Sequence, residues 1–300
     1  MKQDYPSTGI AALCRLFGKT RHAYYDALWR QENCLVKEDI ILQEVIHTRK
    51  QLPSLGTRKL HHVLQPRLAL HKINIGRDYL NDLLAEHNLL IRRRKRKIIT
   101  TDSRHWMRKY SNLIKLITVT RPEQIWVSDI TYIKMINQWG YLSLITDAYS
   151  RKIMGYSFRN DLAAEGCIAA LQMALNNKVY NEQLIHHSDR GSQYCSQQYV
   201  NLLLENNIAI SMTENGDPYE NALAERMNGI IKTEFNLYNT QFGYDQTGKL
   251  IEKSIHAYNN LRPHASCDYM TPDETHLHTG QLNKRWKQYK RKYKYEKAAV

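Results

Sequence analysis

The chain has 300 residues, and its 42% content of hydrophobic residues supports a folded core and excludes a disordered protein. Lys and Arg outnumber Asp and Glu by 43 to 29, so the net charge of +14 favours a polyanionic partner, nucleic acid first, over a protein that is merely basic. No segment has the pattern of a membrane span or a secretory signal, which predicts a cytoplasmic protein.

Helical periodicity dominates the first fifty residues. Apolar residues at spacings of three and four predict one helix over residues 9–30, broken near Gly18, and another over residues 37–50. We treat residues 1–50 as an N-terminal helical region.

Two further helices are predicted before residue 90. Thr57 is expected to cap the first of them, and Pro66 to end it. Asn74 is expected to cap the second, in which Tyr79 faces inward and Arg77 faces outward.

A run of six basic residues follows these helices. It consists of Arg92, Arg93, Arg94, Lys95, Arg96 and Lys97. Short helices joined by tight turns and followed by such a run resemble a helix-turn-helix unit whose last helix enters the major groove. Residues 51–98 are therefore predicted to bind DNA through Arg77 and the basic run. The alternative is a helical connector with ordinary surface charges.

Strands and helices alternate after a weakly periodic linker at residues 99–121. They follow in the order strand 125–136, strand 140–146, strand 152–158, helix 163–176, strand 183–187, helix 196–204 and strand 208–212. Short connections make the first three strands antiparallel neighbours. This order predicts an α/β fold for residues 122–280, a ribonuclease H-like mixed five-stranded sheet with flanking helices, preceded by the all-α region with its helix-turn-helix-like part.

The C-terminal tail, residues 281–300, alternates cations with aromatic rings. Cations can hold phosphates while rings stack on bases, so the tail is a candidate nucleic-acid contact. A solvated tail without specific contacts is the alternative.

Three acidic residues stand in contexts that favour metal binding. Asp129 lies within an apolar strand, where an unpaired buried charge is costly. Asp189 follows the fourth strand beside Gly191, which permits close approach of a ligand, and 35 residues separate it from Glu225 on a predicted helix. Two-metal phosphoryl transfer needs carboxylates that converge from separate elements. We therefore predict that these three carboxylates meet at a metal site.

The helix that carries Glu225 is predicted to have one apolar and one polar face. A helical projection places Leu223 and Met227 toward the core, and Asn228 and Lys232 with Glu225 on the polar face. Because about two turns separate Glu225 from Lys232, we expect Lys232 to hold the DNA end beside the metal site.

Each acid also has a structural alternative. Asp189 could cap its turn, Glu225 could be a surface acid, and Asp129 could pair with a neighbouring cation. The competing acids are Asp147, Asp217, Glu220 and Glu234. His186 and His187 are expected to pack or to orient the Asp189 turn rather than to bind a structural metal.

Arg262 follows a predicted helix at residues 251–258. Its sequence context, NNLRPH, predicts a structured loop, and phosphate contact by the guanidinium is the functional alternative. Arg262 is therefore a further candidate DNA contact.

Several motifs together resemble one protein family. WVSDITY at residues 126–132, HHSDRGSQY at 186–194 and NALAE at 221–225 are similar to the catalytic protein of the bacterial insertion-sequence transposases of family three, relatives of retroviral integrases. YNNLRPH at 258–264 and TPDE at 271–274 match the downstream signature of this family, and residues 55–90 look like its helix-turn-helix segment. Glu220 stands where the family usually has Asp, and Arg226-Met227 replaces the usual Ser-Phe.

This resemblance implies that Asp129, Asp189 and Glu225 form the DDE triad of an integrase-like catalytic core. It also implies two Mg²⁺ or Mn²⁺ ions, recognition of terminal inverted repeats, nicking that frees a 3′-hydroxyl, and strand transfer into target DNA without a covalent enzyme intermediate. The expected partners are DNA, further copies of the chain on that DNA, and a helix-turn-helix protein encoded in an upstream reading frame. A place at the bacterial nucleoid follows from the same resemblance.

Two competing functions keep the same fold. A non-catalytic DNA-binding regulator or targeting protein would bind the repeats without cutting them. A structure-selective nuclease would cut DNA without joining strands. The intact set of three acids favours the transposase.

Overall fold

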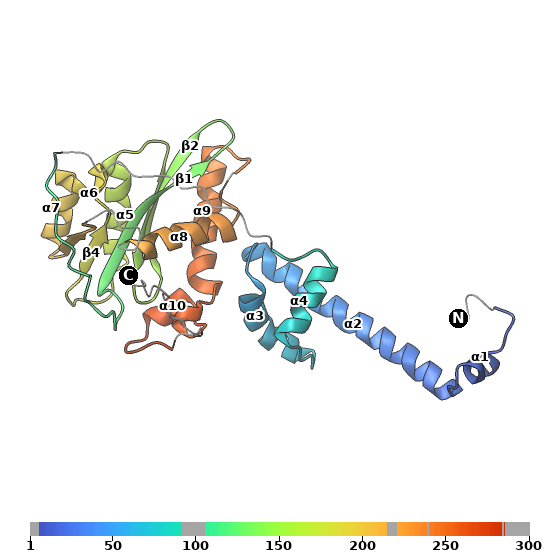
Figure 1. Cartoon of the computed structure of the whole chain (residues 1–300). Helices are drawn as coiled ribbons and strands as arrows, with labels where there is room; N and C mark the ends of the chain where they lie inside the picture. The colour runs from blue at the N-terminus through green and yellow to red at the C-terminus, as the bar shows by residue number, and fades with distance from the viewer. Residues whose placement is uncertain (1–5, 92–105, 215–220, 239, 284, 286–300) are drawn as a thin grey trace, which may run out of the picture. The chain divides into compact units, whose positions relative to one another are not determined.

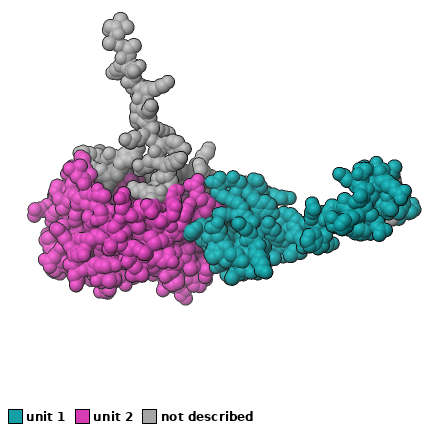
Figure 2. All heavy atoms as spheres, turned by 90° about the horizontal axis from the view of Figure 1, so that it is seen from below, with its two compact units in different colours: residues 1–50, 60–90 teal, residues 51–59, 91–300 magenta. Residues whose placement is uncertain are grey.

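The computed structural model describes the chain except for residues 1–5, 92–105, 215–220, 239, 284 and 286–300. The chain divides into two compact units, residues 1–50 with 60–90, and residues 51–59 with 91–300 (Figure 2). No helix in the described part of the chain combines the length and the apolar character needed to cross a membrane. The basic run and most of the C-terminal tail lie outside the described residues.

The first unit is built from helices (Figure 1). The helices of this part of the chain are α1 (Ile10–Leu16), α2 (Arg21–Gln51), α3 (Thr57–Leu70) and α4 (Arg77–Glu86). Leucines at helical spacing form its core, since Leu60, Leu64, Leu68, Leu80 and Leu84 are at most 2% exposed. Each buried leucine contributes about 2 kcal/mol, which stabilises short helices that would be marginal alone.

The helix bounds of the first unit differ from the prediction at two places. Pro66 lies inside α3 instead of ending it, because burial of Leu64 and Leu68 on either side outweighs the one backbone hydrogen bond that proline removes. The break near Gly18 is confirmed, and Gly18 has a φ of 62° there. After the break, α2 continues as one helix through residues 31–36, where we predicted a separation.

The start of α4 and the position of Tyr79 were predicted incorrectly, whereas Leu83 and Leu84 are buried as expected. Gly76, not Asn74, is the residue that precedes α4. Tyr79 is 38% exposed, and Leu80 is buried in its place. The Tyr79 hydroxyl donates a hydrogen bond to Glu38 at 3.1 Å, so its polar tip draws the ring to the surface of the helix pair.

A five-stranded mixed sheet lies at the centre of the second unit, in the order β3-β2-β1-β4-β5. The strands are β1 (Ile125–Lys134), β2 (Trp139–Asp147), β3 (Ile153–Arg159), β4 (Ile185–Ser188) and β5 (Ala209–Met212). β1, β2 and β3 pair antiparallel, whereas β4 pairs parallel with both β1 and β5. This topology confirms the ribonuclease H-like fold, and each strand lies within about two residues of its predicted bounds.

Helices cover both faces of this sheet (Figure 1). They are α5 (Ala164–Asn176), α6 (Ser192–Cys195), α7 (Gln197–Glu205), α8 (Ala222–Glu234), α9 (Tyr244–Leu261) and α10 (Pro272–His276). Side chains alternate along β1, so Trp126 joins the core cluster that includes α5 and α7, whereas Val127 joins a cluster with Ala224 of α8. Gly155 permits the close packing of α5 on β3, because a Cβ there would overlap the carbonyl oxygen of Ala170.

Candidate active site

Asp129 and Asp189 come from neighbouring parallel strands at matching positions. The register of β1 and β4 pairs Val127 with His187, and each aspartate lies two residues farther along its chain. Because alternate residues of a strand share a face, Asp129 lies on the same face as Val127, which α8 covers. The parallel pairing thus brings the chain positions of the two aspartates to the same end of β1 and β4, and the charge of Asp189 acts on Asp129.

Helix α8 brings further polar groups to this pair. Asn228 Nδ2 donates a hydrogen bond to Asp129 Oδ2 at 2.8 Å, and Asn221 Nδ2 donates one to the backbone oxygen of Ser128 at 3.1 Å. Glu225 is exposed in the first turn of α8, between these two asparagines in sequence. The amides hold α8 against β1 and so keep Glu225 close to the aspartates.

The three acids influence one another electrostatically. Burial raises the pKa of Asp129 to about 7, and the charges of Asp189 and, less strongly, Glu225 add to the increase. The hydrogen bonds from Asn228 and from the Ile130 backbone oppose this shift. The carboxylate of Asp129 is thus poorly stabilised by the protein itself.

Asp189 is held by its own turn. Its Oδ1 accepts a hydrogen bond from the backbone N–H of Gly191 at 3.0 Å. A Cβ on residue 191 would lie 3.1 Å from the same oxygen, so a glycine at this position keeps the carboxylate accessible. This turn fixes Asp189 at the strand end without burying it.

The donor set fits a divalent cation by its chemistry. Mg²⁺ and Mn²⁺ prefer carboxylate oxygens, and a cation would offset the burial and the like charge that raise the pKa of Asp129. In the part of the chain that the structure describes, no three His, Cys, Asp or Glu side chains are grouped closely enough to hold a metal ion. The convergence of all three acids on metal therefore stays a prediction.

The polar face of α8 points to the sheet as well as to solvent, which differs from the helical projection. Met227 is buried as expected, but Asn228 is buried too, at 5% exposure, and faces Asp129. Lys232 is half-buried, and its Nζ donates to the backbone oxygen of Tyr132 at 3.4 Å. The role of Asn228 was missed, although its spacing of three residues from Glu225 places both on one helical face.

Lys232 adds a positive charge near the acids. Burial lowers the pKa of Lys232, and the charge of Asp129 partly restores it. Its ammonium group is therefore an electrostatic neighbour of Asp129, whereas contact between Lys232 and DNA stays a prediction.

His186 and His187 are buried under the site. His186 Nε2 lies 2.7 Å from Ser128 Oγ and 2.8 Å from the Tyr199 hydroxyl, and His187 Nδ1 lies 2.8 Å from Ser211 Oγ. Burial lowers the pKa of His186 to about 3, so this ring is neutral. Both rings connect the sheet to its surroundings, in agreement with the expected packing role.

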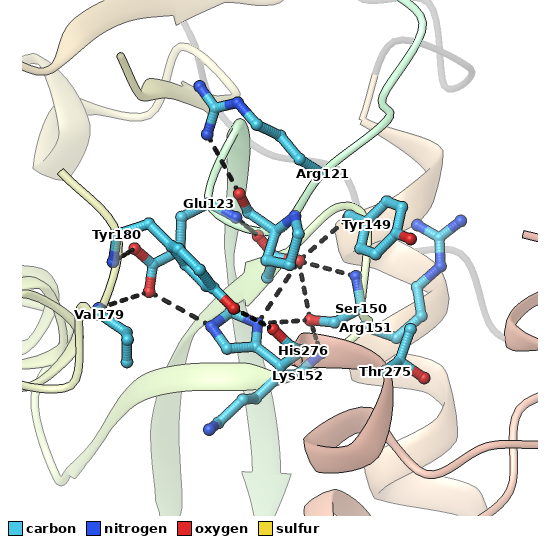
Figure 3. Close-up of polar contacts among 12 residues, drawn as sticks. Arg121, Glu123, Tyr149, Ser150, Arg151, Lys152, Val179, Tyr180, Thr275 and His276 are labelled. Atoms are coloured by element: carbon cyan, nitrogen blue, oxygen red, sulfur yellow. Dashed lines mark hydrogen bonds and ion pairs between the residues drawn. The ribbon is translucent and has the colours of Figure 1, made fainter. Parts of the chain in front are cut away.

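Asp147, a competing acid, belongs to a separate buried cluster. It accepts hydrogen bonds at 2.7 Å from the backbone of Glu123 and from the backbone and hydroxyl of Ser150. Figure 3 shows Glu123, Ser150 and His276 gathered there, with His276 Nε2 at 3.3 Å from Glu123 Oε1. This cluster ties α10 to the start of β1 and the end of β2, so its acids are structural.

The other competing acids do not join the site either. Glu234, at the end of α8, binds Arg262 and Lys59. Asp217 and Glu220 lie outside the described residues.

The predicted DNA contacts have different surroundings. Arg77 is exposed and its guanidinium pairs with Asp78 at 2.7 Å. Arg262 is 2% exposed, and its nitrogens bind Glu234 and His264, so a phosphate cannot reach it in this structure. In this structure Arg262 has a structural role, and its contact with a phosphate stays a prediction. The basic run at residues 92–97 lies outside the described residues.

Comparison with protein families gives two matches over the second unit. Residues 119–218 match a model described as an integrase core domain, and residues 206–272 match a second model with the same description. Together these matches include all three acids of the site.

Three known proteins illustrate the similarity. An uncharacterized 31 kDa protein of insertion element IS600 from Shigella sonnei is 32% identical over 265 residues, which cover 87% of this chain and 96% of that protein. Transposase InsF for insertion sequence IS3A from Escherichia coli K12 is 32% identical over 154 residues, 51% of this chain and 54% of InsF. A solved structure of the HTLV-2 integrase catalytic core domain in complex with magnesium has 24% identity and a TM-score of 0.42, covering 52% of this chain and 97% of that domain.

Proposed function

The chain belongs to the IS3 family of insertion-sequence transposases, in the DDE integrase-like superfamily, and on this premise we propose that Asp129, Asp189 and Glu225 are its catalytic triad. The observation that carries the proposal is the adjacency of Asp129 and Asp189 on paired strands, with Glu225 close enough to raise the pKa of Asp129. The proposed reaction is nicking at the inverted-repeat ends of the element, followed by strand transfer into target DNA.

The same three carboxylates would hold two Mg²⁺ or Mn²⁺ ions. Bound divalent ions activate the attacking oxygen and stabilise the leaving oxygen of a phosphodiester. The residues of the chain prepare the site: Asn228 orients Asp129, and the turn at Gly191 orients Asp189. Side chains held in one arrangement lose little entropy when the DNA binds, which favours the reactive geometry.

DNA binding would use surfaces outside the triad. We propose that residues 51–98, with Arg77 and the basic run Arg92–Lys97, recognise the terminal repeats, and that Lys232 contacts the DNA end beside Glu225. The remaining proposed divisions are an N-terminal helical region at 1–50, a linker at 99–121, the catalytic core at 122–280 and a basic tail at 281–300. The net charge of +14 supports this arrangement, because phosphate contacts dominate nucleic-acid affinity.

The proposed partners extend beyond DNA. Strand transfer of two element ends requires that both ends be held together, so we propose that copies of the chain assemble on DNA. A helix-turn-helix protein from an upstream reading frame is a further proposed partner.

An end-cleavage assay tests the proposal. The full chain is incubated with a labelled duplex that carries the terminal inverted repeat, with Mg²⁺ or with EDTA, and nicked and joined products are separated by length. We expect both products with Mg²⁺ and neither with EDTA. Asp189→Asn should abolish both products and keep DNA binding, whereas Glu205→Gln, at an exposed acid of α7, should leave them unchanged.

Two outcomes would replace the proposed function. Binding without nicking would make the chain a DNA-binding regulator of the same fold. Nicking without joined products would make it a nuclease. Full activity of Asp189→Asn would remove that residue from the triad.

A further inference from the structure

A partly buried cluster of charges lies at the C-terminal end of α8. Arg262 Nε and Nη2 donate to the two carboxylate oxygens of Glu234 at 2.8 and 2.6 Å. Lys59 Nζ donates to Oε1 of the same carboxylate at 3.1 Å. Arg262 Nη1 lies 2.7 Å from His264 Nε2, and because arginine only donates, this nitrogen of His264 is the acceptor. The cluster thus joins α8, the end of α9 and Lys59, which belongs to the same compact unit.

The segment that contains Lys59 also holds the backbone at this helix end. Residues 51–59 belong to the same compact unit as the catalytic core, although they precede it by more than sixty residues in sequence. The Ser54 backbone N–H donates to the backbone oxygen of Glu234 at 3.0 Å, and Ser54 Oγ donates to Asn236 Oδ1 at 3.4 Å. The last carbonyls of a helix lack hydrogen-bond donors within the helix, and the Ser54 N–H is the donor for the carbonyl of Glu234.

The cluster contains more positive charges than negative ones. Two cations face one carboxylate, and His264 stays neutral because burial, followed by the charge of Arg262, holds its pKa well below the usual range. Burial and repulsion from Arg262 lower the pKa of Lys59 to about 8, while Arg262 and Lys59 together keep the pKa of Glu234 low against the effect of burial. Arg262 is thus the main counter-ion of Glu234, and Lys59 adds a further donor to the same carboxylate although burial disfavours its charge.

The geometry of α8 connects this cluster to the site. Glu225 and Glu234 lie nine residues apart on one helix, which corresponds to about 13 Å along its axis. A tilt of the helix by about 5° about its C-terminal end would therefore move Glu225 by about 1 Å. A displacement of that size at a reacting centre can lower a rate by about 100-fold. A small change in how the C-terminal end of α8 is held would thus lower the reaction rate.

We propose that Lys59, Arg262 and Glu234 form a positioning cluster for Glu225, and that Lys59 makes this positioning depend on the segment 51–59, which lies outside the catalytic core. The inference rests on the proposed role of Glu225. Lys59 and Arg262 touch no reacting group and act through α8. Docking of residues 51–59 then stabilises the active orientation of α8.

Single substitutions of Lys59 test this role in the full chain. Lys59→Met leaves the Arg262–Glu234 pair in place, so the protein should fold, and Lys59→Arg restores a cation that reaches the carboxylate. We expect Lys59→Met to lower the rate of nicking at saturating Mg²⁺ by about 10-fold, with an unchanged Kd for terminal-repeat DNA. Lys59→Arg should recover most of the rate. Lys249→Met, at an exposed lysine of α9, is the matched control and should leave rate and Kd unchanged.

Hydrogen–deuterium exchange gives a second readout that does not need activity. In Lys59→Met, amides of α8 should exchange faster while those of β1 keep their protection, and Lys59→Arg should restore the exchange of α8. A Lys59→Met protein with the exchange and the nicking rate of Lys249→Met would overturn the inference. Equal loss of protection in α8 and β1 would also overturn it, because Lys59 would then support the whole fold.

The activity of the wild-type chain distinguishes a failure of the proposed function from a failure of the positioning cluster. Absence of nicking by the wild-type chain would refute the proposed function, while the exchange experiment would still test the anchorage of α8. Active wild type with an unaffected Lys59→Met would refute only the positioning cluster.

Discussion

Helix α8 has opposite electrostatic surroundings at its two ends. Near its N-terminal end, Glu225 lies close to acids of the sheet, and burial with like charge raises the pKa of Asp129 to about 7. At its C-terminal end, Glu234 binds Arg262 and Lys59, and these cations lower its pKa although burial opposes them. The first end concentrates repulsion that a bound cation would relieve, whereas the second end is already satisfied by the fold.

The largest expected effect comes from a substitution of Asp129, near the N-terminal end of α8. Asp129→Asn should lower nicking by about 1000-fold or more, because one carboxylate of the proposed metal site is lost. The folded-state pKa of Asp129 lies above the ordinary 3.8, so its ionisation costs stability as pH rises from about 4 through 7. Asp129→Asn should therefore melt at the same or a higher temperature than wild type in EDTA at pH 8.

The response to metal is the control for this prediction. Mg²⁺ should raise the melting temperature of the wild type and have little effect on Asp129→Asn. A large decrease in the melting temperature of Asp129→Asn in EDTA would show that Asp129 is a structural acid.

The second prediction concerns the ion pair at the C-terminal end of α8. Arg262→Met removes the main counter-ion of a mostly buried carboxylate and should lower the free energy of unfolding by about 3–5 kcal/mol in urea denaturation. Arg77→Met, at an exposed pair with Asp78, is the control and should change it by no more than about 0.5 kcal/mol. Equal effects of the two substitutions would contradict the role of Arg262.

The stability that Glu234 contributes should depend on pH. The pKa of Glu234 is lowered in the folded state, so its contribution to stability is present above the ordinary pKa of 4.5 and is lost as pH falls through the folded-state value. Glu234→Gln should be about 2 kcal/mol less stable than wild type at pH 7, and this difference should shrink below pH 4.5. A difference that stays constant between pH 7 and pH 3.5 in denaturation would refute this account.

The smallest expected effect concerns Asn228. Asn228→Ala removes the hydrogen bond to Asp129 and should lower the nicking rate by about 10-fold, since the aspartate loses an orienting partner. Its melting temperature should change less than that of Arg262→Met. An unchanged rate would mean that Asp129 keeps its orientation without the amide.

Local patterns explain how much of the fold could be predicted. The β-branched and aromatic residues of β1 and β2 and the short connection between the strands are local in the sequence, and both strands were predicted within two residues. Pro66 shows the limit of this reasoning, because its local preference to end α3 is outweighed by leucines packed from elsewhere in the unit.

The candidate site likewise has one part that could be predicted from the sequence and one part that could not. The three acids could be selected from their contexts, since an acid in an apolar strand and an acid beside a glycine turn are visible in the sequence. The contact of Asn228 with Asp129 could not be predicted, because a helical projection shows which residues share a face but not what that face touches. The pairing of Arg262 could not be predicted for a similar reason, because its partner Glu234 lies 28 residues away.

The order of strands and helices, the family resemblance and the choice of the three candidate acids could be read from the sequence, because these depend on local periodicity and residue type. Only the tertiary structure decided which polar groups meet. Parallel pairing aligns β1 with β4, helix packing turns Asn228 toward Asp129, and Lys59 of the segment 51–59 reaches Glu234 at the end of α8. These contacts depend on the burial and pairing of groups that are distant in the chain, which no local pattern specifies.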